Sequence, residues 1–306
     1  MKTLDRFPPL PLEEWKDNKQ TLHLFVQIVG KIRMELTPPQ NHWWHVPLYV
    51  NTRGLGTSSI PNNSHRFEIN FDFISHQVSI ATSRGQRDAF DLQDGLSVSE
   101  FYKNLFSIMD DFDIEADILS KPYDMPFDTP FAEDREHDRY DKKYVEQYWS
   151  ILSEIDRIFR VFNHDFRGKV CPVQLYWHSF DLAVTRFSGK QAPPMPEAGT
   201  VDREAYSHEV ISFGFWPGDD NIPDAAFYSY TFPSYTFPAP DGLVEAPLQP
   251  ENAFWAEQNG SPMALVMYED VRKAEDPEQA VLNFLRSAWQ AGVEKAGWDT
   301  ETLIKS

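Results

Sequence analysis

The segment HRFEINFDFISHQVSIATS, residues 65–83, alternates apolar and polar side chains with a period of two. Its apolar positions are Phe67, Ile69, Phe71 and Phe73, and its polar positions are Arg66, Glu68, Asn70 and Asp72. Successive side chains of a strand point to opposite faces, so the pattern predicts a β-hairpin with one buried face. One-sided burial of this kind is typical of antiparallel sheets. We therefore expect an antiparallel sheet with helices packed against it.

Helical periodicity, with apolar side chains recurring at threes and fours, runs through residues 12–36 and ends at Pro38 and Pro39. Further helices are expected at 97–112, where Ser97 and Glu100 form a capping pattern, at 142–164, and from the Asp276-Pro277 cap to about Gly297. Strands are expected at 45–52, 172–179, 181–187, 207–216, 225–232 and 263–268. Two proline-rich segments, 119–141 and 189–199, are expected to be irregular.

The order helix, strands, helix occurs twice along the chain. A shift of 127 residues (151 − 24) aligns residues 24–60 with 151–187 without gaps. Identical residues then coincide at six positions: Ile28, Arg33, Val46, Leu48, Tyr49 and Leu55 fall on Ile155, Arg160, Val173, Leu175, Tyr176 and Leu182. We predict an α+β fold of two duplicated helix–antiparallel strands–helix units with pseudo-twofold symmetry. The expected boundaries are 1–120, an acidic proline-rich connector at 121–141, and 142–306, with one compact domain as the alternative.

Composition narrows the class of protein. The chain has 306 residues, of which 41% are hydrophobic, as in a folded globular protein. Its 28 Lys and Arg stand against 47 Asp and Glu, a formal net charge of −19. Such a field repels phosphate backbones and anionic membranes, so neither nucleic acid nor membrane is an expected partner. Without a signal segment or a membrane-spanning apolar run, a cytoplasmic location is expected.

Metal and nucleophile patterns are weak in this sequence. The single cysteine, Cys171, precedes Pro172 and is expected to be a small buried apolar side chain. His42 and His45 lie three apart between a proline pair and an expected strand, where they would point to opposite faces. No metal site is therefore predicted, and the sequence does not identify a cofactor. In the shifted alignment, HWW at 42–44 is aligned with KVC at 169–171, which is chemically different. This difference indicates a position at which one half could have specialised.

The best candidate for a functional strand is YSHEVISFGFW, residues 206–216. If this segment is extended, Ile211, Phe213 and Phe215 form a core face. The opposite face then carries the phenol of Tyr206, the imidazole of His208, the hydroxyl of Ser212 and the indole of Trp216, with a gap at Gly214, which has no side chain. Aromatic walls with a few polar anchors suit a ligand pocket.

Neighbouring segments offer more candidates for the same pocket. The segment HSFDLAVTRF offers Asp181 and Arg186, which could form an ion pair, and a further strand offers Tyr228. His42, Trp43 and Trp44 would close the pocket from the first half.

Three functions are compatible with these residues. The first is binding of a small molecule in an aromatic-lined cleft between the halves, by His42, Trp43, Trp44, Arg186, Tyr206, Trp216 and Tyr228. The second is an enzyme in that cleft, with His208 as general acid or base oriented by Asp181. The third is a scaffold whose exposed aromatic side chains bind another protein. The sequence leaves the ligand, any reaction and the oligomeric state open.

Several stretches together resemble a known family. They are NHWWHVPLYVNTRGL, DREHDRYD, YWHSFDLAVTRFSG, and YSHEVISFGFWPG with DAAFYSYTFP. They are similar to a bacterial family of about this length, a domain of unknown function of the DUF5996 type. The resemblance extends over nearly the whole chain. It implies one shared architecture and no known activity, so it assigns no catalytic residue.

Overall fold

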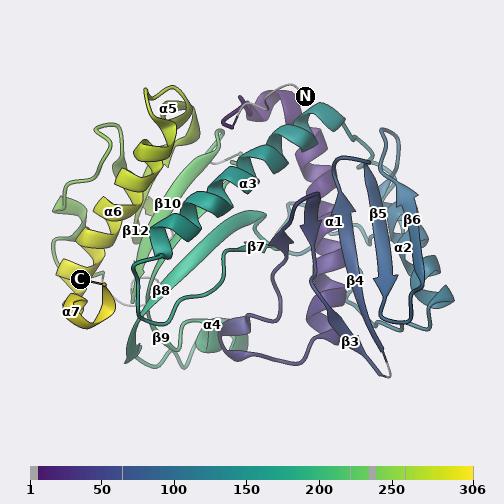
Figure 1. Cartoon of the computed structure of the whole chain (residues 1–306), viewed down its shortest axis with the longest axis horizontal. Helices are drawn as coiled ribbons and strands as arrows, with labels where there is room; N and C mark the ends of the chain where they lie inside the picture. The colour runs from purple at the N-terminus through teal and green to yellow at the C-terminus, as the bar shows by residue number, and fades with distance from the viewer. Residues whose placement is uncertain (1–5, 64, 221, 234–238, 259, 306) are drawn as a thin grey trace. The chain divides into compact units, whose positions relative to one another are not determined.

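A computed structural model describes residues 6–63, 65–220, 222–233, 239–258 and 260–305. In this part of the chain, seven α-helices and two antiparallel sheets of six strands each confirm the predicted α+β class (Figure 1). The chain divides into two compact units. Unit 1 comprises residues 1–39, 45–153 and 174–180, and unit 2 comprises residues 40–44, 154–173 and 181–306.

Unit 1 combines α1 (Leu12–Leu36), α2 (Val98–Asp111) and the first half of α3 (Lys142–Asn163) with a sheet in the order β1-β2-β4-β5-β6. Its strands are β1 (Tyr49–Val50), β2 (Gly54–Gly56), β3 (Ile60–Asn62), β4 (His65–Asp72), β5 (Gln77–Thr82) and β6 (Arg87–Asp91), and β3 pairs with β4. The strand β7 (Gln174–Tyr176) also belongs to unit 1, where Leu175 bridges Leu48.

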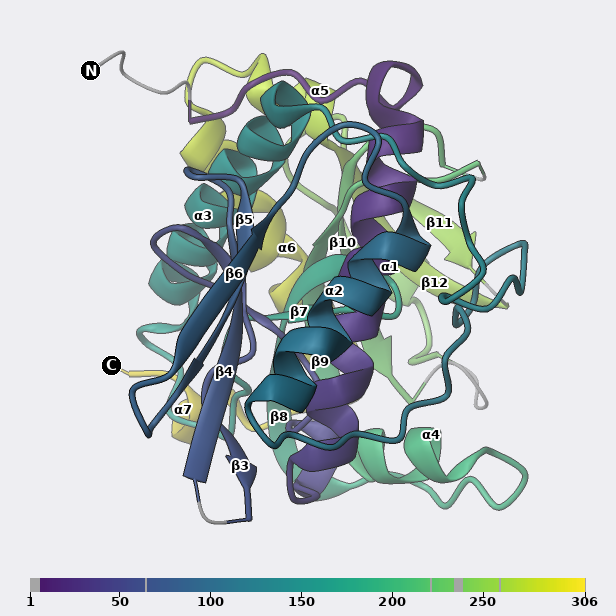
Figure 2. The same ribbon diagram turned by 90° about the vertical axis from the view of Figure 1, so that its right-hand side faces the viewer.

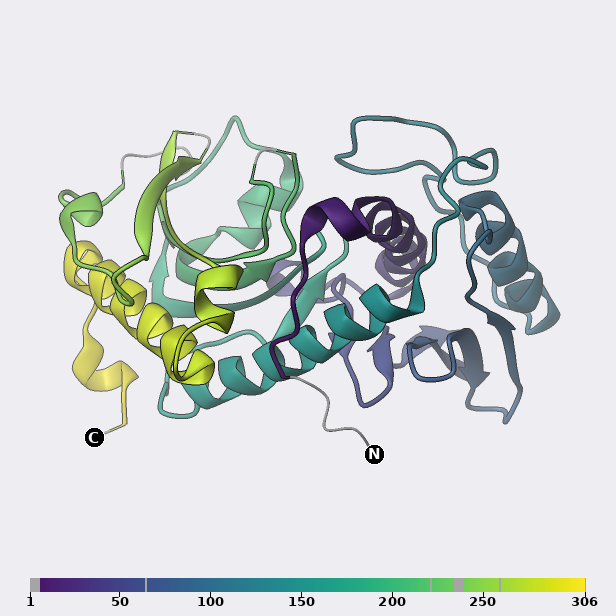
Figure 3. The same ribbon diagram turned by 90° about the horizontal axis from the view of Figure 1, so that it is seen from above.

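The predicted hairpin is β4 and β5, which pair Phe71 with Val78 and Ile69 with Ile80. The apolar side chains of β4 are buried, whereas Arg66 and Glu68 are exposed. Helices α1 and α2 lie on the same face of this sheet (Figures 2 and 3). Their contact is aromatic, because Phe101 of α2 stacks on Phe25 of α1 with 4.1 Å between ring centroids. The core of unit 1 therefore lies between the hairpin and these two helices.

The start of α2 confirms the predicted capping pattern. The Ser97 side chain accepts from the Glu100 backbone N–H, and the Glu100 carboxylate accepts from the Ser97 backbone N–H. After α2, residues 119–141 form neither helix nor strand, as predicted. This segment is nevertheless part of the core, because Phe131 and Tyr140 are buried.

In the described part of unit 2, five strands follow one another in the sheet in the order β11-β12-β10-β9-β8. They are β8 (Asp181–Gln191), β9 (His208–Trp216), β10 (Ala226–Phe232), β11 (Phe254–Gln258) and β12 (Ser261–Met267). Its helices are the second half of α3, α4 (Thr200–Ala205), α5 (Tyr268–Arg272), α6 (Pro277–Ala296) and α7 (Thr300–Leu303), with short 3-10 turns η1 (Asn41–Trp43) and η2 (Leu243–Glu245).

One face of β9 forms the core of unit 2, as predicted. Ile211, Phe213 and Phe215 are fully buried. Phe213 packs against Phe162 of α3 at 4.9 Å between ring centroids. Helix α6 crosses so close that a Cβ on Gly292 would lie 2.6 Å from Ile211 Cδ1. Both helices thus cover this face, and the candidate residues lie on the other.

Candidate functional site

The segment that opens with NHWW forms a strained turn instead of the expected extended lead into a strand. His42 and Trp43 both adopt left-handed backbone conformations, with φ of 56° and 61°. Such conformations cost about 1–2 kcal/mol for each residue other than glycine. The turn places the His42 ring against the end of α4, where Nδ1 lies 3.0 Å from the Ala205 carbonyl oxygen.

The second ring nitrogen of His42 faces a lysine. Lys169 Nζ lies 2.6 Å from His42 Nε2. Because Nδ1 faces a carbonyl, it must carry the proton, and Nε2 is left to accept from the lysine. Burial lowers the pKa of His42, and Lys169 and His208 lower it further. His42 is therefore a neutral acceptor that fixes the position of the lysine amine.

The described neighbours of Lys169 are aromatic and not acidic. Its Nζ lies 5.1 Å from the centre of the Trp44 ring and 5.0 Å from that of Phe187. In the described part of the chain, no carboxylate lies within ion-pair distance of this amine. Burial lowers the pKa of Lys169. Although the net charge of the chain is −19, no described carboxylate neutralises this cation.

His208 completes this group of side chains. It is the first residue of β9, and its ring lies 5.3 Å from the His42 ring in an edge-on arrangement. Its Nδ1 lies 3.2 Å from Ser207 Oγ, and the side chain is half-buried. We call the group His42, Trp44, Lys169, Phe187 and His208 the Lys169 patch. All five residues belong to unit 2.

A second group on the same face of the sheet is a hydroxyl network. The Tyr228 hydroxyl donates to the Asp181 carboxylate, and the Tyr228 ring stacks on Tyr230. The Tyr230 hydroxyl lies 3.0 Å from that of Tyr206, and burial raises the pKa of Tyr230 well above its usual value. Next to it, Thr185 and Ser212 bond to each other at 2.9 Å. These groups satisfy one another within the fold.

The expected gap at Gly214 is filled. A Cβ on Gly214 would lie 2.2 Å from Tyr228 Cζ, because the phenol lies flat over the glycine. The small residue allows the ring to approach the backbone. This part of the face is packed and does not form an open pocket.

Two pairings expected from the sequence do not form. Arg186 is enclosed by the rings of Phe162, Phe166 and Trp289, and its ion-pair partner is Asp165 at 3.7 Å. The expected Asp181–Arg186 ion pair is therefore wrong. Residues five apart in an extended strand point to opposite faces, which explains the error.

The expected orientation of His208 by Asp181 is also wrong. Leu182 pairs with Phe215, so Asp181 lies beside the Trp216 end of β9, whereas His208 begins the strand. Eight residues of extended chain separate these ends by roughly 26 Å. The structure thus brings His42, Trp44 and His208 together, and separately Asp181 with Tyr228.

The remaining candidates lie outside both groups. Trp216 is half-buried at the end of β9, where it pairs with Ala226. Trp43 is half-buried in η1.

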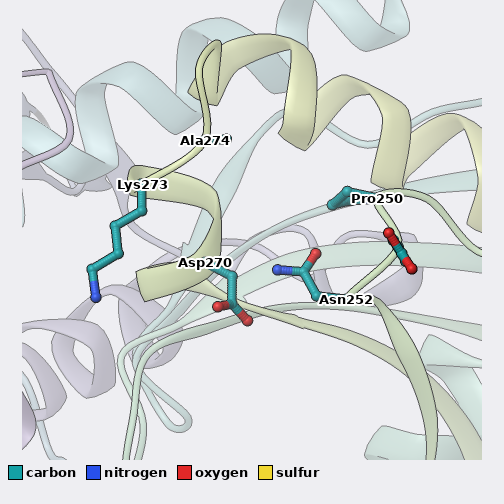
Figure 4. Close-up of a pocket in the computed structure, with 6 residues that line it drawn as sticks. Pro250, Asn252, Asp270, Lys273 and Ala274 are labelled. Atoms are coloured by element: carbon teal, nitrogen blue, oxygen red, sulfur yellow. The ribbon is translucent and has the colours of Figure 1, made fainter.

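A shallow hollow lies elsewhere on unit 2, with a volume of about 590 Å³. It is lined by Pro250, Glu251, Asn252, Asp270, Lys273 and Ala274, and contains none of the predicted site residues. Figure 4 shows side chains that line this hollow, among them Asp270 and Asn252. Because Lys273 pairs with Glu269 at 2.8 Å, its charge is already compensated.

Comparison with known proteins gives the family. The model of the family of unknown function DUF5996 matches residues 7–305. The chain belongs to this family. No curated protein and no solved structure matches the chain. Within the described residues, no helix is long and apolar enough to cross a membrane, and no three His, Cys, Asp or Glu side chains are grouped to hold a metal ion.

Membership of this DUF5996 family assigns no activity and no functional residue. The residue that sequence reasoning missed is Lys169, which lies after α3 in the stretch RGKVC and fits no motif. The one hint in the sequence was the alignment at an offset of 127 residues, which pairs Lys169 with His42. The two residues at these aligned positions contact each other.

Proposed function

We propose that unit 2 binds a small anionic molecule, a carboxylate or phosphate, at the Lys169 patch. The observation that carries the proposal is the amine of Lys169, which has a neutral imidazole as its polar partner and no carboxylate at ion-pair distance among the described residues. Half-buried charges in proteins are normally paired. A bound anion would supply the missing countercharge.

The neighbours of Lys169 suit such a ligand. His42 accepts one hydrogen of the ammonium group and leaves two to donate elsewhere. His208 offers a second nitrogen-bearing ring 5.3 Å from that of His42. Trp44 adds an aromatic surface against which the apolar part of a ligand can rest. The patch therefore combines charge, hydrogen-bond donors and an apolar wall.

The enzymatic alternative is less well supported. A histidine that acts as general acid or base is commonly oriented by a carboxylate. The carboxylate expected for His208 was Asp181, which bonds to Tyr228 instead. We accordingly assign His208 to ligand binding and expect His208→Gln to weaken anion binding with little change in stability.

The proposed duplication accounts for the origin of the patch. We infer that the strand series β2-β4-β5-β6 and β8-β9-β10-β12 descend from one unit, since both run in chain order and begin 127 residues apart, at Gly54 and Asp181. Two pairs of aligned residues also touch, Leu48 with Leu175 and His42 with Lys169. Residues near the twofold axis of a homodimer contact their own copies in this way. After duplication, one such position could become histidine and the other lysine.

Calorimetric titration tests the proposed function. Citrate and inorganic phosphate serve as probes, and Lys169→Met is compared with Lys190→Met, which removes an exposed lysine of the same unit. We expect the probe to bind the wild type. Its affinity for Lys169→Met should be at least tenfold lower, and its affinity for Lys190→Met should equal that for the wild type. A probe at a hundred times its Kd should stabilise the wild type by about 2.7 kcal/mol. Equal binding by both variants, or binding by neither probe, would contradict the proposal.

A further inference from the structure

Unit 1 contains a lysine in a different environment from that of Lys169. Lys31 of α1 is only 4% exposed. Its Nζ faces the rings of Trp177 and Phe131, at 5.7 and 6.0 Å from their centres. The indole lies directly on α1, because a Cβ on Gly30 would come within 2.2 Å of Trp177 Cγ. The amine is therefore held among aromatic rings, largely out of water.

No group in the described part of unit 1 compensates the charge of Lys31. Within the described ranges, no hydrogen-bond acceptor and no carboxylate contacts its amine. Glu35, one turn further along α1, is exposed and forms no ion pair with it. Burial lowers the pKa of Lys31, and the like charge of Lys121 lowers it further.

The two lysines differ in the form that their surroundings favour. Lys169 donates to His42, and such a hydrogen bond favours the protonated amine. Among the described residues Lys31 has no acceptor, and burial and the like charge of Lys121 both favour the neutral amine. Desolvation together with a neighbouring cation is how proteins produce nucleophilic lysines.

Apolar side chains are exposed on the segment whose Phe131 ring faces the Lys31 amine. The segment that carries Phe131 and Lys121 also exposes Leu119 and Tyr123, at 68% and 55% of their surface. The Tyr123 ring packs edge-on against Trp177 at 6.3 Å. One exposed side chain, Tyr123, thus contacts the indole that faces the amine.

We propose that Lys31 is a nucleophilic amine that forms an imine with a small aldehyde or ketone, an activity beyond the anion binding of unit 2. The amine lone pair forms a C–N bond with the carbonyl carbon while the π electrons of the C=O bond move to oxygen. The two nitrogen-bound protons pass to that oxygen. The C–O bond then breaks, water leaves, and a C=N bond remains.

Reductive trapping tests this inference. The folded wild type is incubated with propanal and cyanoborohydride at pH 7, and adducts are assigned by peptide mass spectrometry. Each unit by which a lysine pKa falls raises its neutral fraction about tenfold at this pH. We expect Lys31 to be alkylated at least tenfold faster than Lys190. The Lys31→Arg variant should not form this adduct. The Lys121→Met variant should form it more slowly, because the positive charge that lowers the pKa of Lys31 is removed.

Labelling at Lys31 no faster than at Lys190 would overturn the proposal. If Lys31→Arg does not fold, as judged by circular dichroism, the pH dependence of labelling in the wild type decides. The midpoint for Lys31 should then lie below that for Lys190, and equal midpoints would overturn the inference. The outcome is independent of the Lys169 patch, because Lys169→Met should leave the Lys31 adduct unchanged.

Discussion

Replacement of Arg186 by alanine should destabilise unit 2 strongly, because this side chain is structural. Its Nε donates to Asn163 Oδ1 at 3.0 Å, and its Nη2 donates to the Phe162 carbonyl. Its guanidinium lies 3.7 Å from the centre of the Phe162 ring and 4.7 Å from that of Trp289. Hydrogen bonds from a charged donor contribute about 1.5–3 kcal/mol each, and a buried cation–π contact up to about 2 kcal/mol.

These contributions are not additive, and we expect Arg186→Ala to cost about 3–5 kcal/mol, similar to breaking a buried ion pair. For a domain of this size, the melting temperature should fall by roughly 6–20 °C. Urea unfolding, followed by tryptophan fluorescence, measures the loss in free energy of unfolding. The free energy of unfolding of Arg186→Lys should lie between those of the alanine variant and the wild type. A loss below about 0.5 kcal/mol would refute the structural role and restore Arg186 as a ligand-binding candidate.

Three further predictions concern single residues. Ser97→Ala removes the cap of α2 and should cost about 1 kcal/mol in urea unfolding. Burial holds the pKa of His23 at about 3, against 6.5 when unfolded. The unfolded chain therefore binds a proton that the folded chain does not, and the free energy of unfolding should fall by up to about 1.4 kcal/mol for each pH unit from 6.5 toward 3. His23→Gln should make the fall in unfolding free energy across this pH range smaller by that amount. Cys171 is buried with a pKa raised to about 11, so it should react with a thiol reagent at neutral pH only after denaturant is added.

The long elements of the fold could be predicted because each repeats its period several times. The periodicity of residues 12–36 coincides with α1 (Leu12–Leu36), and the hairpin at 65–83 coincides with β4 and β5. The last helix begins after Asp276 and ends at left-handed Gly297, as its cap residues predicted. Strands such as β2 and β3, of three residues each, are too short to display a period. They form because neighbouring strands complete their hydrogen bonds.

The strand expected at 45–52 shows how tertiary contacts override a local pattern. Only Tyr49 and Val50 form β1. His42 and Trp43 turn the preceding chain into left-handed conformations, and a hydrogen bond to Ala205, far along the sequence, holds the turn. No local signal in NHWW reveals that partner.

The candidate site was predicted in part. Strand alternation correctly separated the core face of β9, with Phe213, from the face that carries His208. It could not assign partners, because pairing depends on register between strands. Arg186 and Asp181 were therefore paired wrongly, and Lys169 was missed because an isolated lysine carries no pattern.

Nitrogen-15 NMR of the His42 ring, recorded during an anion titration, tests the central claim most directly. Without a probe at pH 7, Nδ1 should be protonated and Nε2 unprotonated, as the contacts with Ala205 and Lys169 require. Phosphate or citrate should shift the His42 and His208 signals in the wild type and leave them unchanged in Lys169→Met. A doubly protonated His42 at pH 7 would contradict the account. Ring nitrogen signals that do not shift when the anion is added to the wild type would also contradict it.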